Sequence, residues 1–200
     1  NLLWRSDAFR EKLIAANLSH IVIVVATEPG FSDLLVSRCI AAAESQDITP
    51  LIVLNKADLE DRLPAARAQL APFRKLGYEV IEISALRGAD GLRARLNTLH
   101  AIFVGQSGMG KSTLTNALIP EANAATREIS DALDSGKHTT TFARLYPLAP
   151  EDEAKGAPGA DAASAGWLID SPGLQVFGLA HLTPDSLAET FIEFRPFLGK

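Results

Sequence analysis

A glycine-rich loop placed between an apolar strand and a helix is the feature that most constrains how this chain can fold. Residues 105–113 read GQSGMGKST and match the pattern G-x-x-x-x-G-K-[ST] at every fixed position. The loop follows the apolar run 101–104 and precedes a predicted helix over 111–118. Glycines let backbone N–H groups point at phosphate oxygens, and the helix N-terminus adds its dipole. The segment therefore predicts a phosphate-binding loop.

Three side chains of this loop have predicted roles. Lys111 would bridge the β- and γ-phosphates of a nucleotide, the Ser112 hydroxyl would ligate Mg²⁺, and Thr113 would lie near the α-phosphate. The alternative, a glycine-rich turn with a chance Lys-Ser pair, is disfavoured by the strand before the loop and the helix after it. The predicted nucleotide-binding residues here are Gly105, Gln106, Ser107, Gly108, Met109, Gly110, Lys111, Ser112 and Thr113.

Strands alternate with helices along most of the chain, which predicts an α/β fold with a mostly parallel, doubly wound sheet. Buried or alternating apolar runs predict strands at 20–26, 50–55, 78–84, 101–104, 141–148 and 167–170. Helical spacing predicts helices over 32–45, 62–76, 90–99, 111–118 and 184–194, with Arg93 and Arg95 exposed on the third of them.

The predicted domain organisation is simple. Residues 1–19 are expected to be a lead-in or linker segment containing at most a short helix, and residues 20–200 to form one domain. Residues 149–166 are rich in Ala, Gly, Pro and acidic residues and have almost nothing to bury, so a flexible, solvated insertion is expected there.

Composition excludes several classes of protein. The single cysteine, Cys39, cannot form an internal disulfide or a multi-thiolate metal site, which favours a reducing compartment. The apolar run 21–26 is far too short to cross a membrane. A net charge of −5 disfavours a stand-alone nucleic-acid clamp. We therefore expect a cytoplasmic protein that does not associate with membranes. A monomer is our working expectation, which composition does not test.

A second motif predicts which base the site accepts. Asn55, Lys56, Ala57 and Asp58 read NKAD and follow the buried strand 51–54, at the sheet edge where α/β proteins bind ligands. The Asp58 carboxylate can accept hydrogen bonds from guanine N1–H and the exocyclic amine, and adenine offers neither donor. The motif therefore predicts GTP or GDP as ligand, with an ATPase as the alternative.

The next strand ends in Ser84, Ala85 and Leu86. The Ala85 backbone N–H can reach guanine O6 from this position. Either motif alone could be a surface turn, but two in succession after buried strands favour a guanine pocket.

Two further segments resemble nucleotide-sensing switches. Asp170–Gly173 reads DSPG after the strand 167–170, so Asp170 would hold Mg²⁺ through water and the Gly173 N–H would meet the γ-phosphate. In GKHTTT (residues 136–141), Thr140 is the predicted Mg²⁺ ligand and Thr139 the alternative. His138 could position the attacking water, although a lone histidine in a loop is more often simply solvated.

The order of these motifs, NKAD, SAL, GQSGMGKST, HTTT and DSPG, is unusual, because most P-loop NTPases of the Ras-like G-domain fold begin with the phosphate loop. The reversed order and GKHTTT resemble the circularly permuted GTPases that mature the small ribosomal subunit, the RsgA (YjeQ) family. The resemblance covers essentially the whole chain.

The resemblance implies that the protein binds the small (30S) ribosomal subunit and its rRNA late in assembly and hydrolyses GTP faster on the ribosome. It also implies an N-terminal OB-fold and a C-terminal zinc domain, neither of which is found in these 200 residues. Leu174 occupies the position where many GTPases carry a water-orienting glutamine, so a nucleotide-gated binding module with little turnover is one alternative. A permuted GTPase acting on the large subunit is another.

Overall fold

A central six-stranded sheet organises the molecule. The computed structural model describes residues 1–6, 11–119, 122, 143–148, 166–173 and 177–198. The strand order across the sheet is β5-β4-β3-β6-β8-β7, and every neighbouring pair is parallel except β7 and β8. The strands are β3 (His20–Ala26), β4 (Thr49–Asn55), β5 (Glu79–Glu82), β6 (His100–Val104), β7 (Arg144–Leu148) and β8 (Gly166–Asp170).

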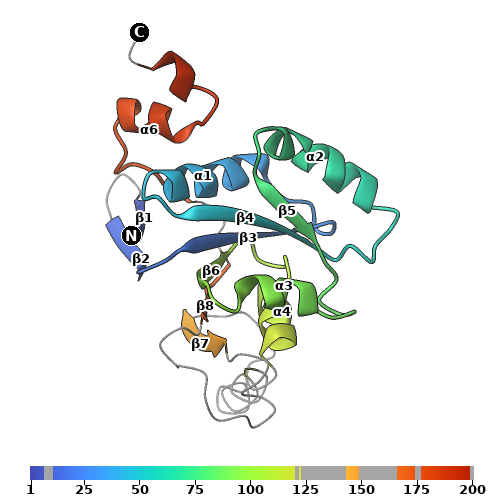
Figure 1. The fold of residues 1–200 in the computed structure, drawn as a ribbon. Coiled ribbons are helices and arrows are strands. Elements are labelled where there is room, and N and C mark those ends of the chain that lie inside the picture. The colour runs from blue at the N-terminus through green and yellow to red at the C-terminus, as the bar shows by residue number, and fades with distance from the viewer. Residues whose placement is uncertain (7–10, 120–121, 123–142, 149–165, 174–176, 199–200) are drawn as a thin grey trace.

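Helices cover both faces of this sheet (Figure 1). On one face lie α1 (Asp33–Glu44) and α2 (Leu63–Lys75), and on the other lie α3 (Asp90–Leu96) and α4 (Lys111–Leu118). The Ser32 hydroxyl caps α1 by accepting from the Leu35 N–H at 3.3 Å. Gly77, at φ +94°, lies just past the end of α2. The predicted parallel, doubly wound α/β fold is confirmed.

The two central strands are buried on both sides, as their uninterrupted apolar sequences require. In β3 and β6, Ile21, Val22, Val24, Ile102 and Phe103 are fully buried. Burial of these side chains is the main stabilising contribution to the domain, since each large apolar side chain contributes about 1.5–3 kcal/mol. The same strands end at the loops that carry the predicted motifs.

The first sixteen residues differ from the sequence prediction. Instead of a short helix they form a two-stranded antiparallel hairpin, β1 (Leu2–Ser6) and β2 (Glu11–Ala16). Leu3 pairs with Ala15, and both side chains join the core. The hairpin also contacts the chain beyond the DSPG segment, because the Ser6 N–H donates to Gly178 O at 3.0 Å and the Ser6 hydroxyl lies 2.8 Å from His181 Nδ1. The first strands are part of the packed unit.

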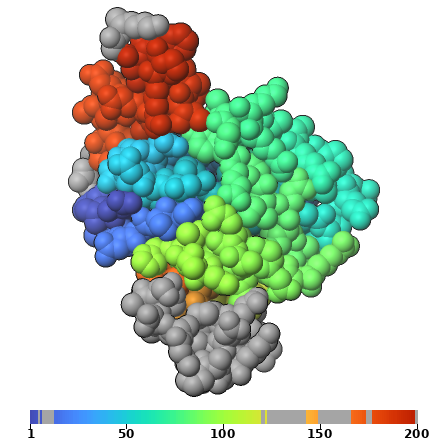
Figure 2. All heavy atoms as spheres, in the orientation of Figure 1, coloured from blue at the N-terminus to red at the C-terminus, as the bar shows by residue number. Residues whose placement is uncertain are grey.

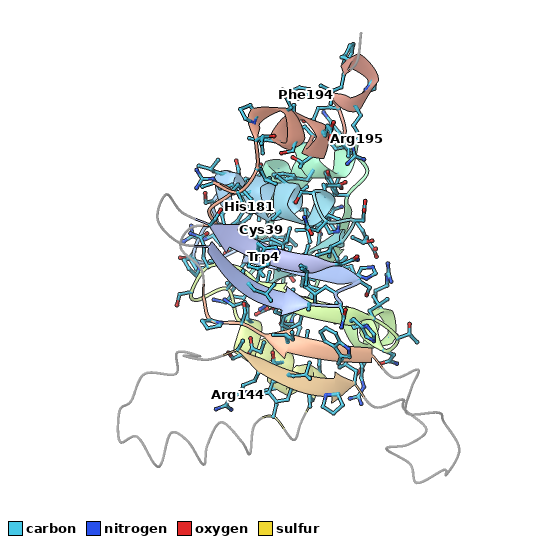
Figure 3. All side chains as sticks on the ribbon, turned by 90° about the vertical axis from the view of Figure 1, so that its left-hand side faces the viewer. Trp4, Cys39, Arg144, His181, Phe194 and Arg195 are labelled. Atoms are coloured by element: carbon cyan, nitrogen blue, oxygen red, sulfur yellow. The ribbon has the colours of Figure 1, made fainter. Side chains whose placement is uncertain are left out.

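The C-terminal segment packs over α1 (Figures 1 and 2). Its helix α6 (Pro184–Thr190) is shorter than predicted, and a 3₁₀ turn, Arg195–Phe197, follows. Figure 3 shows Phe194 and Arg195 at this end of the molecule, opposite Arg144 of β7. The Arg195 guanidinium contacts the Glu44 carboxylate at 2.7 Å, which ties the segment to the end of α1.

Other expectations differ in detail. Helix α3 ends at Leu96, and its Arg93 is half-buried, because its guanidinium donates to Leu118 O of α4 at 2.8 Å. A strand is predicted over 141–148. Residues 141 and 142 lie outside the described residues, and the strand β7 begins at Arg144. Residues 149–165 of the predicted insertion lie outside the described residues, and Gly166 is already the first residue of β8.

The permuted order places a short turn, residues 97–99, between α3 and β6, and this turn packs against the start of β8. The Gly166 N–H donates to Asn97 O at 2.7 Å, and the Trp167 N–H donates to Leu99 O at 3.0 Å. A β-carbon on Gly166 would lie 2.7 Å from the carbonyl oxygens of Leu96, Asn97 and Leu99. This contact between the turn and β8, which we call the joint, therefore leaves no room for a side chain at residue 166.

We predict that Gly166→Ala lowers the free energy of unfolding by about 1–3 kcal/mol, because the new methyl group overpacks the joint. Chemical denaturation of the nucleotide-free protein measures the change. Gly91→Ala is the matched control, since nothing lies within 4 Å of its added carbon in α3. The control should be neutral or slightly stabilising, by up to about 1 kcal/mol. Equal stability of the two variants would contradict the packing argument.

Candidate functional site

The predicted motifs meet at one edge of the sheet, at the carboxyl ends of the parallel strands. NKAD follows β4, SAL follows β5, the glycine-rich loop follows β6, and DSPG begins at the end of β8. In open α/β sheets this edge is where ligands bind. The fold thus brings together segments that are far apart in the sequence.

Two glycines of the phosphate loop have no room for a side chain. Gly105 runs against β3, where a β-carbon would collide with the Val24 carbonyl oxygen. Gly110, at φ +88°, lies against the side-chain amide of Asn55. Because Gly110 is also the residue before α4, its conformation directs the first N–H groups of that helix toward the loop interior.

The Asn55 side chain connects three of the motifs. It is almost completely buried, its Nδ2 donates to Met109 O at 3.0 Å, and its Oδ1 accepts from the Ala85 N–H at 3.1 Å. Beside it, Lys56 Nζ donates to Gly108 O at 2.9 Å. The sequence predicts that the Ala85 N–H donates to guanine O6. In this structure that N–H donates to Asn55 Oδ1 instead.

The Asp58 carboxylate, predicted to read guanine, is ionised in this structure's surroundings. Asp58 lies at the partly exposed end of the NKAD turn. The nearby Ser84 hydroxyl, followed by the backbone N–H of Asp58 and the charges of Arg87 and Lys56, lowers the pKa of the carboxyl. At neutral pH Asp58 is therefore ionised. An ionised carboxylate only accepts hydrogen bonds, which suits the two adjacent donors of guanine.

Lys111 folds back onto the phosphate loop. Its Nζ donates to Gly105 O and Gln106 O, both at 2.9 Å, and the residue is 6% exposed. Burial lowers the pKa of the ammonium group, and the neighbouring Asp170 carboxylate opposes that shift. The ammonium group is held inside the loop, where it can exchange carbonyl partners for phosphate oxygens.

Asp170 is a buried carboxylate whose surroundings fit a metal ion. The residue is 4% exposed, and its Oδ2 accepts from the Ser112 hydroxyl at 3.2 Å. Its Oδ1 is buried without a hydrogen-bond partner among the described residues. Burial raises the pKa of this carboxyl, against the hydrogen bond from Ser112 and the charge of Lys111. A hydroxyl and a carboxylate with an unpaired oxygen are hard oxygen donors that fit Mg²⁺.

The DSPG turn returns to the phosphate loop. The Ser171 hydroxyl donates to Phe103 O, which fixes the start of the turn to β6. A β-carbon on Gly173 would lie 2.9 Å from the Ser107 backbone nitrogen. Gly173 thus lies directly against the phosphate loop, where the γ-phosphate-sensing role assigned to its N–H requires it to be.

Comparisons with known proteins agree with this geometry. The family model described as "RsgA GTPase" matches residues 1–180. The chain belongs to the RsgA GTPase family.

Curated proteins of the RsgA GTPase family are similar to this chain over nearly its whole length. Small ribosomal subunit biogenesis GTPase RsgA of Burkholderia pseudomallei is 54% identical over 203 residues, covering 100% of this chain and 60% of that protein. The protein of the same name from Paraburkholderia xenovorans is 54% identical over 202 residues, covering 99% of this chain and 61% of the relative. The chain thus spans about 60% of the length of these relatives.

Two solved structures share the fold. YjeQ from Thermotoga maritima matches with a TM-score of 0.66 and 24% identity, over 97% of this chain and 59% of that one. YloQ, described as a circularly permuted GTPase, matches with a TM-score of 0.60 and 22% identity, over 98% of this chain and 63% of that one. The circular permutation inferred from motif order is confirmed at the level of the fold.

Some predicted RsgA-family site residues cannot be placed. Thr139, Thr140 and His138 lie outside the described residues, as does Leu174. Leu86 is described and is 83% exposed at the rim of the site. Among the described residues no group of three or more His, Cys, Asp or Glu side chains could hold a metal ion, and none of the described helices is long and apolar enough to cross a membrane.

Sequence reasoning missed one segment of the site, the loop 27–32 after β3. Its Thr27 hydroxyl donates to Lys56 O at 2.9 Å, and its Ser32 N–H donates to Gln106 Oε1 at 3.0 Å. The available signal was Pro29-Gly30 directly after a buried strand, at the same sheet edge as the motifs.

We predict that Asp170→Asn stabilises the nucleotide-free protein at pH 7. Because burial raises the pKa of Asp170, the folded state binds the proton more tightly than the unfolded chain. Stability therefore falls as pH rises from the unfolded pKa through the raised folded value, so ionisation of Asp170 carries a stability penalty. Removing it should raise the Tm by roughly 2–4 °C. The same change should abolish the Mg²⁺ dependence of nucleotide binding.

The pH profile separates this explanation from general repacking. Below the unfolded pKa of about 3.9 the carboxyl is protonated in both the folded and the unfolded state, so the Tm difference between variant and parent should shrink. Glu60→Gln, at an exposed position before α2, is the control and should leave the Tm within about 1 °C. A pH-independent loss of stability in Asp170→Asn would show that the carboxylate is needed for packing.

Proposed function

We propose that this chain is the GTP-binding and GTP-hydrolysing domain of a factor that matures the small ribosomal subunit. The observation that carries the proposal is the Asn55 amide, which joins the NKAD segment to the phosphate loop at Met109 and to the SAL segment at Ala85. The relatives named small ribosomal subunit biogenesis GTPase support the biological role. We further infer that the protein acts as a cytoplasmic monomer.

The reaction assigned to the site is transfer of the γ-phosphoryl group of GTP to water, giving GDP and phosphate. The Lys111 ammonium group would leave its carbonyl partners and neutralise charge on the β- and γ-phosphates. The Gly173 N–H would donate to a γ-phosphate oxygen. Asp58 would accept from guanine, so the base and the phosphates are held at opposite ends of one rigid edge.

Ser112 and Asp170 would hold Mg²⁺, and Thr140 would join them when the γ-phosphate is bound. When bound, Mg²⁺ neutralises charge on the phosphate oxygens. His138 is our candidate for positioning the attacking water, because Leu174 has no polar atom with which to do so. A poorly positioned water explains a slow intrinsic reaction that the ribosome accelerates.

Asp58→Asn tests the guanine pocket. The variant replaces an acceptor with a group that cannot accept from both guanine donors, so GDP affinity should fall by roughly 10–100-fold. Xanthosine diphosphate, which presents an acceptor in place of the exocyclic amine, should gain affinity. Fluorescence titration measures both. Unchanged nucleotide preference would favour the ATPase alternative.

Phosphate release by the full-length protein, with and without purified small subunits, tests the ribosomal role. We expect small subunits to raise turnover at least tenfold, and large subunits to have no comparable effect. The absence of stimulation would favour the alternative function, a nucleotide-gated binding module with little hydrolysis, for which Leu174 is the specific observation. Stimulation by large subunits alone would assign the protein to another assembly pathway. Ribosome contacts, an OB-fold and a zinc domain outside these residues remain part of this proposal.

A further inference from the structure

The loop 27–32, which we call the bridging loop, lies between the two nucleotide-binding loops although it matches no nucleotide-binding motif. It begins where β3 ends and finishes at Ser32, the N-cap of α1. Thr27 is 8% exposed and Phe31 is 9% exposed, so both ends of the loop are anchored in the protein.

One end of the bridging loop supports the guanine-reading turn. Lys56 has φ +58°, a left-handed conformation that is unusual for a residue other than glycine. The Thr27 hydroxyl donates to the Lys56 carbonyl oxygen at 2.9 Å. In return, Lys56 Nζ donates to Glu28 O at 2.7 Å. These two hydrogen bonds hold the backbone of Lys56 in the conformation that presents Asp58 to the base.

The other end supports the phosphate loop. The Gln106 side chain reaches the bridging loop, where its Oε1 accepts from the Ser32 N–H at 3.0 Å. Pro29 packs against Gly108, where an added β-carbon would be 3.4 Å from the proline ring. The phosphate loop is therefore held from outside by the bridging loop as well as from inside by Lys111.

A third contact fixes the bridging loop to the rest of the fold. Gln69 of α2 donates from Nε2 to Phe31 O at 3.0 Å and also contacts the Asp33 carboxylate. The loop is thus attached to α2, to α1 and to both nucleotide-binding loops.

We propose that Thr27 and Gln106 are positioning residues, whose side chains use the bridging loop to fix the guanine-reading loop and the phosphate loop at the separation that a guanine nucleotide requires. This inference rests on the proposed GTP-binding function. Neither side chain needs to touch the nucleotide. Their effect is to reduce the ordering that the two loops undergo on binding, which slows nucleotide release.

The test is the rate at which the protein releases a fluorescent GDP analogue, measured by stopped flow with excess unlabelled GDP. Gln106→Met keeps the length of the side chain and removes its acceptor, and Thr27→Val keeps its shape and removes its hydroxyl. Each variant should release the analogue about three- to tenfold faster than the parent, because each loses one hydrogen bond that orders the loops. Thr27→Ser, which retains the hydroxyl, should restore a rate within about twofold of the parent.

Thr183→Ala is the control for a merely structural effect. It removes the hydroxyl that caps α6 by accepting from the Ser186 N–H, outside the bridging loop and the two nucleotide-binding loops. It should lower the Tm of the nucleotide-free protein and leave nucleotide release unchanged, whereas Gln106→Met should accelerate release.

Two results would overturn the inference: release at the parental rate in both Gln106→Met and Thr27→Val, or equal acceleration by Thr183→Ala. Failure of the parent protein to bind the analogue would overturn the proposed function together with this inference. If the parent binds the analogue and both variants release it at the parental rate, this inference alone is overturned.

Discussion

The two-sided hydrogen bonding of one buried amide, that of Asn55, is the interaction on which the rest of the site depends. A primary amide is among the few side chains that can donate and accept in opposite directions at one place. Here Nδ2 of Asn55 donates to the phosphate loop, and Oδ1 accepts from the loop after β5. Since the group is buried, loss of either partner would leave a polar atom unsatisfied, at a cost of about 1–3 kcal/mol. The geometry of both loops is therefore coupled to the packing of β4.

The other end of the site contains two buried charged side chains, Asp170 and Lys111. Burial raises the pKa of Asp170 and lowers the pKa of Lys111, so in both residues it favours the neutral form. Such an arrangement contributes little to the stability of the empty protein, because desolvation offsets the attraction between the charges. It would gain its full value when phosphate oxygens bind Lys111 and Mg²⁺ binds Asp170. The burial of these two side chains therefore favours ligand binding and does not stabilise the ligand-free fold.

Much of the site could be predicted from sequence, because each motif combines fixed spacing with a position at the end of a buried strand. Gly105, Asn55 and Asp170 all lie where that reasoning places them. The hairpin Leu2–Ala16 was missed because its short strands have weak periodicity, and their burial depends on contacts with residues near 178. The contact between Ser32 and Gln106 joins residues 74 positions apart through a backbone N–H, which leaves no pattern in residue spacing.

The pairing of Ser6 with the segment after DSPG has a consequence for how the chain folds. Ser6 and His181 are 175 residues apart in sequence, whereas paired residues within the strands β3 to β6 are at most 81 positions apart, as for His20 and Ala101. Because closing a long loop costs more entropy than closing a short one, the contacts of Ser6 are expected to form after the β3–β6 half of the sheet has assembled. During synthesis the strands β1 and β2 would then emerge well before the segment near His181 that they contact, and the hairpin would reach its place in the fold only after the DSPG segment had been made.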